Sequence, residues 1–218
     1  MTKLDDPTFY HKTIRFSHSF EVVYVVMALV FVYGLFNCAF YDRSLEFGVK
    51  LTVYFSFFYG FMNNGRIFKF LLNDCRCAGK PNSVSGFTFI SFYSFIVWFV
   101  EYMKSTKEYS PIHKIFFIFN EALCMMNFTA TYIGSYHTYR QILYGAINTT
   151  LGLSTVYLFI SYVPPIPSII ISSTALLASY FISLKVTGPV DFSIRAGNFT
   201  IPFNAYILFK VIQAKLSK

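Results

Sequence analysis

Residues 141–184 read QILYGAINTTLGLSTVYLFISYVPPIPSIIISSTALLASYFISL, a stretch without any charged side chain. A helix needs about 20 predominantly apolar residues to cross the hydrocarbon core of a bilayer. Two runs have about that length, 141–162 and 166–184, and prolines at 164, 165 and 167 mark the connection between them. Proline breaks the interior of a helix but is well tolerated in the first turn of the next one. The stretch therefore predicts two membrane-spanning helices joined by a tight turn.

The whole chain has the composition of a membrane protein. Its 218 residues are 55% hydrophobic and 21% aromatic, and 13% are charged, whereas about 25% of the residues in soluble globular domains are charged. This composition excludes an intrinsically disordered chain, a coiled coil and a secreted disulfide scaffold. We predict an all-α fold, a polytopic membrane helix bundle with about six transmembrane helices that forms a single membrane domain over 1–218.

The apolar runs give the boundaries of these helices. The predicted transmembrane runs are 20–40, 47–72, 86–103, 115–134, 141–162 and 166–184. A further apolar stretch, 201–213, is too short to span a bilayer comfortably. We expect it to form a short helix that lies on the membrane surface or re-enters the membrane.

The formal charge of +8 is the balance of 18 lysines and arginines against 10 acidic residues, and the cations lie mainly between the apolar runs. Loops of membrane proteins carry such residues, so the charge points to lipid headgroups or an anionic substrate and not to nucleic acid. With six crossings, both termini and the loops 73–85 and 134–141 share one side of the membrane, which carries most of the cations. The positive-inside rule makes that side cytosolic.

Cys75 and Cys77 lack a second pair of cysteines that would complete a metal site. We predict neither a metal nor a cofactor.

Cations and a histidine gather on this side of the membrane. Arg66, Lys69 and Arg76 have a spacing that places them on one face of a continuing helix. Long cationic side chains at a membrane boundary commonly extend to the lipid headgroups. Arginine and lysine together also bind phosphate oxygens. Ser83 precedes the third predicted helix, where free backbone N–H groups attract anions, and His137 precedes the fifth. These residues alone indicate a candidate phosphate site.

Residues 135–146, SYHTYRQILYGA, resemble the third motif of the dolichyldiphosphatases, which reads much like Y-H-T-W-S-Q-V-x-Y-G. These enzymes belong to the type-2 phosphatidic acid phosphatase superfamily, whose first motif is K-x6-R-P. Lys69 and Arg76 have the K-x6-R spacing. The segment 79–85, GKPNSVS, resembles the second motif, and 194–202, IRAGNFTIP, resembles the dolichyldiphosphatase tail. The motifs follow one another in the order that the family has.

The resemblance implies a role for each motif. His137 is expected to attack phosphorus and form a phosphohistidine, while Lys69, Arg76 and Ser83 bind the phosphoryl oxygens. The implied protein is a multi-pass phosphatase of the endoplasmic reticulum membrane. It serves protein glycosylation by hydrolysing a dolichyl (polyisoprenyl) diphosphate, with its site facing the lumen. This orientation conflicts with the charge count, and we prefer it because substrate binding accounts for several of the cations.

Two catalytic residues of the family are replaced. Val84 stands where the second motif has the histidine that protonates the leaving group, and Thr131 stands where the third motif has an arginine. Arg140 could supply the missing phosphate-binding cation, and His18, which enters the first predicted helix, could supply the acid. Gln141 stands at the aspartate position of the third motif, as glutamine does in the dolichyldiphosphatases themselves.

Three functions stay open on this basis. The first is a divergent dolichyl diphosphate phosphatase with impaired hydrolysis through His137. The second is a catalytically inactive pseudoenzyme, a membrane subunit that binds a lipid phosphate or assembles with other membrane proteins. The third is an unrelated channel or transporter, which requires polar residues or broken helices along a pore.

Overall fold

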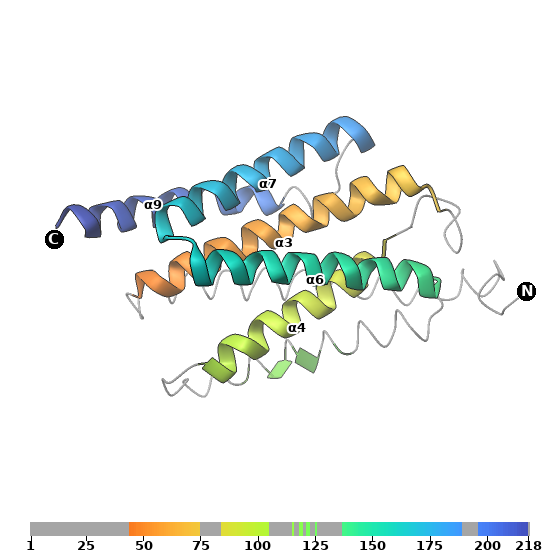
Figure 1. Cartoon of the computed structure of the whole chain (residues 1–218), viewed down its shortest axis with the longest axis horizontal. Coiled ribbons are helices and arrows are strands. Elements are labelled where there is room, and N and C mark those ends of the chain that lie inside the picture. The colour runs from red at the N-terminus through yellow and green to blue at the C-terminus, as the bar shows by residue number, and fades with distance from the viewer. Residues whose placement is uncertain are drawn as a thin grey trace, which may run out of the picture. The chain divides into compact units, whose positions relative to one another are not determined.

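The computed structural model describes residues 44–74, 84–104, 137–188 and 196–217, together with six single positions between 115 and 125 (Figure 1). The secondary structure of these described ranges is helical, and they contain no strand. The helices are α3 (Leu45–Leu72), α4 (Gly86–Lys104), α6 (Tyr139–Tyr162), α7 (Pro165–Thr187), the 3₁₀ helix η4 (Ala196–Phe199) and α9 (Thr200–Leu216).

Four of the predicted membrane runs correspond to α3, α4, α6 and α7, with ends that differ by at most three residues. Among the described helices, α6 and α7 are long and apolar enough to cross a membrane. These two are the helices predicted from 141–184, and they indicate a membrane protein. The run 20–40 lies outside the described residues, and within 115–134 six positions are described, all helical. The count of six transmembrane helices therefore stays a prediction.

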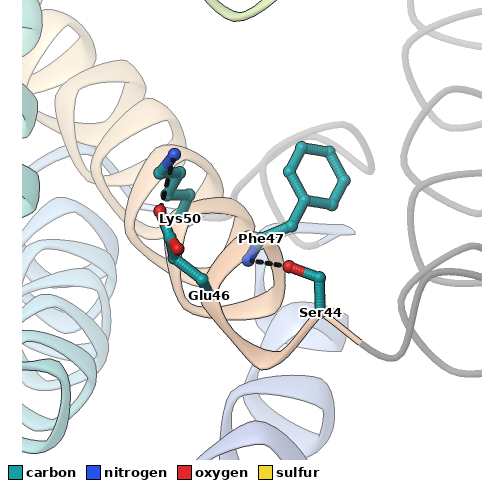
Figure 2. A network of polar contacts seen from close by, with 4 residues as sticks. All are labelled: Ser44, Glu46, Phe47 and Lys50. Atoms are coloured by element: carbon teal, nitrogen blue, oxygen red, sulfur yellow. Dashed lines mark hydrogen bonds and ion pairs between the residues drawn. The ribbon is translucent and has the colours of Figure 1, made fainter. Parts of the chain in front are cut away.

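Local interactions fix the start of α3 (Figure 2). Ser44 Oγ accepts a hydrogen bond from the N–H of Phe47 at 3.3 Å, which makes Ser44 the cap of the first turn. Glu46 and Lys50 lie one turn apart and form an ion pair of 3.2 Å. An acidic residue in the first turn also opposes the positive end of the helix dipole.

The chain forms two compact units. Unit 1 comprises Met1–Val30 and Phe68–Thr150, and unit 2 comprises Phe31–Ile67 and Leu151–Lys218. The described part of unit 1 contains the last turn of α3, α4 and the first half of α6. Unit 2 contains most of α3, the second half of α6, and α7, η4 and α9.

In unit 2, α9 packs against α7 and α3. Ile207 and Val211 of α9 form an apolar core with Ile169 of α7. Gly48 of α3 lies so close to α9 that an added Cβ would be 2.8 Å from the side chain of Ile207. The observed helix is longer than the predicted 201–213, and one of its faces is buried in unit 2.

Candidate active site

In unit 1 the first turns of α4 and α6 are in direct contact. The N–H of Ser85, just before α4, donates to the carbonyl of Gln141 in α6 at 3.0 Å. One turn along α6, a Cβ added to Gly145 would lie 2.6 Å from the carbonyl oxygen of Ser85 and 3.0 Å from Cβ of Thr88. Glycine permits this close approach because it has no side chain. Ser85, the last residue of the segment that resembles the second motif, therefore lies beside the segment that resembles the third.

Thr138 and Gln141 begin α6 with reciprocal hydrogen bonds. Thr138 Oγ1 accepts the N–H of Gln141 at 3.3 Å, and Gln141 Oε1 accepts the N–H of Thr138 at 3.1 Å. Threonine and glutamine three residues apart form a capping box, which satisfies donors at the helix start. The box turns the buried Gln141 side chain back over the start of α6.

His137 precedes the capping box and is 4% exposed. Its Nδ1 lies 3.1 Å from Gln141 Oε1. Because the N–H of Thr138 also donates to this atom, the amide oxygen faces the ring, and an amide oxygen only accepts hydrogen bonds. Nδ1 therefore carries a proton, and in the neutral imidazole Nε2 holds the lone pair. A histidine ring held in this way by a hydrogen-bond acceptor can present Nε2 as a nucleophile.

Lys69 lies near the same turn of α4. The helix α3 ends one turn after it, where Asn73 adopts φ 45° and donates its N–H to the carbonyl of Lys69 at 3.1 Å. Lys69 Nζ is 3.8 Å from the position that a Cβ on Gly86 would take. Ser85 caps α4, because its Oγ accepts the N–H of Thr88 at 3.2 Å and the hydroxyl of Thr88 at 2.9 Å. An ammonium group and a helix start both favour an anion.

The predicted site residues divide into three groups. His137 lies at the start of α6, and Lys69 lies near the start of α4. The predicted residues outside the described ranges are His18, Arg76 and Ser83. Arg140 is exposed on α6, where its Nε donates to the hydroxyl of Tyr144 at 2.9 Å and its guanidinium lies 5.5 Å from the ring centroid. The role of Arg140 in phosphate binding stays a prediction.

Sequence reasoning did not single out Thr138 or Gly145. The T-x-x-Q spacing of 138–141 is a signature of a helix start and identifies the pair of residues that holds the His137 ring. Gly145 carries no such local signal, because its importance depends on how closely α4 approaches α6 in space.

Replacing Ser85 by alanine removes the cap of α4 and leaves the backbone contact with Gln141 in place. We expect the free energy of unfolding to fall by about 1 kcal/mol. For a chain of this size, the midpoint of thermal unfolding falls by roughly 2–4 °C, measured on the purified protein in detergent. Ser85→Thr keeps a capping hydroxyl and is expected to unfold closer to the wild-type midpoint than Ser85→Ala. Equal midpoints for the alanine and threonine variants contradict the capping role.

No protein-family model, no curated protein and no solved structure matches the chain. The resemblance to the dolichyldiphosphatases therefore stays a prediction from the motifs.

Proposed function

We propose that the chain is a six-helix protein of the endoplasmic reticulum membrane that binds a dolichyl, or other polyisoprenyl, diphosphate at its lumenal side and hydrolyses it slowly. The observation that carries this proposal is the buried His137–Gln141 pair beside the capped start of α4. Lys69 lies near the same turn, so residues from all three motif-like segments contribute to one region of unit 1. This grouping is what a phosphate site built from the three motifs requires.

In the proposed reaction, Nε2 of His137 attacks the terminal phosphorus. The bond between phosphorus and the bridging oxygen breaks, and dolichyl phosphate leaves. Water then hydrolyses the phosphohistidine, which releases inorganic phosphate and regenerates the imidazole. Gln141 Oε1 holds the proton on Nδ1 while the ring gains positive charge, and Lys69 with Arg76 stabilises the charge on the phosphoryl oxygens.

The proposed hydrolysis is slow because the leaving group lacks an acid. Val84 is buried and aliphatic, and it cannot donate a proton. General acid assistance is worth about 10²- to 10⁴-fold in rate, although a phosphate leaving group needs it less than an alkoxide does. The same observation favours a second candidate, a pseudoenzyme that binds the lipid phosphate without hydrolysing it.

The two candidates are separated by measuring phosphate release and lipid binding side by side. Purified full-length protein in detergent is given dolichyl diphosphate, and a His137→Ala variant sets the background. Release above this background supports the phosphatase. Binding without release supports the pseudoenzyme, and the absence of both overturns the proposal.

A further inference from the structure

A separate cluster of polar side chains lies inside unit 2. Asn204 of α9 donates through Nδ2 to Ser56 Oγ of α3 and Ser173 Oγ of α7, both at 2.9 Å. Asn63 of α3 donates through Nδ2 to Ser179 Oγ of α7 at 3.2 Å. We call these five residues the polar seam. Hydrogen bonds of this kind join helices where the surroundings are apolar.

Two acceptors of the polar seam are buried without a donor among the described residues. The Oδ1 atoms of Asn63 and Asn204 are buried and accept no hydrogen bond from the described residues. The hydroxyl oxygens of Thr52 and Ser183, one turn from the seam on α3 and α7, are in the same situation. All four residues are at most 2% exposed. An amide oxygen only accepts, so Asn63 and Asn204 each require a donor from elsewhere, and a buried acceptor without one lowers stability.

Gly60 leaves room for a small donor beside Ser179, the residue that accepts from Asn63. It lies four residues after Ser56 and three before Asn63, on the same face of α3. Among the described residues, and beyond the backbone of its own helix, a Cβ on Gly60 would have one neighbour within 4 Å, the Ser179 Oγ at 3.8 Å. A position that admits a methyl group without a clash is about the size of a water molecule, and the nearby polar atoms supply hydrogen-bond partners.

The charges of unit 2 favour a neutral donor over a cation. Among the described residues of unit 2, Glu46 is the one acidic side chain, and it is exposed and paired with Lys50. A cation in the polar seam would therefore be buried without a counter-charge, which costs far more than burying a neutral molecule. Water donates two hydrogen bonds and also accepts from hydroxyl groups, which matches the chemistry of the unpaired atoms.

We propose that the polar seam is an internal water-binding site, in which a water molecule beside Gly60 donates to Asn63 Oδ1 and joins α3 to α7. The site is independent of the proposed phosphatase function, because every residue that forms it belongs to unit 2. Its role is to satisfy acceptors that the three helices cannot satisfy themselves.

The substitution Gly60→Ala tests this site by thermal unfolding of the full chain in detergent. If no water is bound, the alanine side chain fits and the midpoint of thermal unfolding rises, because alanine forms helices more readily than glycine. With bound water, the added methyl group displaces it and leaves Asn63 Oδ1 unpaired, so we expect the midpoint to fall by about 2 °C or more. A midpoint that rises or stays the same overturns the proposal.

Two controls exclude other causes of such a fall. In an Asn63→Leu background the amide oxygen is gone, and Gly60→Ala is expected to leave the midpoint unchanged or raise it. A fall in that background as well indicates a steric clash and overturns the proposal. The wild-type midpoint is also expected to be the same in sodium chloride and choline chloride at equal concentration. Stabilisation by sodium that Gly60→Ala abolishes would assign the site to a cation instead of water.

Discussion

Phosphate release from dolichyl diphosphate is expected to fall to background when His137 is replaced by alanine. Nε2 of His137 is the atom proposed to bond to phosphorus, and removing a catalytic nucleophile costs on the order of 10⁶-fold in kcat. Wild-type release is itself expected to be slow, because Val84 cannot protonate the leaving group. The detection limit of the assay therefore sets the largest ratio of wild-type to variant release that can be measured. Equal release from the wild type and His137→Ala contradicts the nucleophile role.

Variants of the capping box separate a loss of chemistry from a loss of folding. Gln141→Leu removes the acceptor that holds the Nδ1 proton, and we expect release to fall by about 10²-fold or more, as when the orienting residue of a catalytic histidine is replaced. Gln141→Glu keeps an acceptor and is expected to retain activity. Thr138→Val removes the hydroxyl of the capping box but keeps the hydrogen bond between His137 and Gln141. If Thr138→Val loses as much activity as Gln141→Leu, helix stability and not ring orientation explains the loss.

The sequence predicted the helices better than their contacts. Long apolar runs are the strongest signal in a membrane protein, and the absence of charge over 141–184 was enough to predict α6, α7 and the turn between them. The last helix was predicted too short, because Lys215 and Ser217 interrupt the apolar pattern near its end. Packing of Ile207 and Val211 against Ile169 of α7 supports this helix. A local hydropathy pattern cannot predict such contacts between helices.

The candidate site was predictable where its geometry is local. His137 came from a motif, and the spacing of Thr138 and Gln141 is sufficient to predict that the glutamine turns back toward the start of α6. The polar seam was not predicted, because Asn63 and Asn204 are far apart in the sequence and neither belongs to a recognisable motif. Only the pairing of α3, α7 and α9 shows that these amides lie in one buried cluster.

Gly145→Ala is expected to destabilise the protein, against the usual preference for alanine in a helix. Alanine in place of a glycine in a helix interior normally stabilises by roughly 0.5–1 kcal/mol. Here the added Cβ would lie 2.6 Å from the carbonyl oxygen of Ser85, a backbone atom that cannot rotate away. The start of α4 must therefore shift, and overpacking of this kind costs about 1–3 kcal/mol. We expect the midpoint of thermal unfolding to fall by at least about 2 °C.

The same shift is expected to reduce phosphate release, because it strains the hydrogen bond from the Ser85 N–H to Gln141, the residue that orients His137. A displacement near 1 Å at a catalytic site can cost about 10²-fold in rate. Ser154→Ala is the matched control, since it introduces the same residue at an exposed position of α6 and is expected to leave release unchanged and the midpoint unchanged or slightly raised. If Gly145→Ala behaves like this control in both measurements, α4 does not depend on the close approach at Gly145. A fall in release at an unchanged midpoint indicates that the contact serves the alignment of His137 more than the stability of the fold.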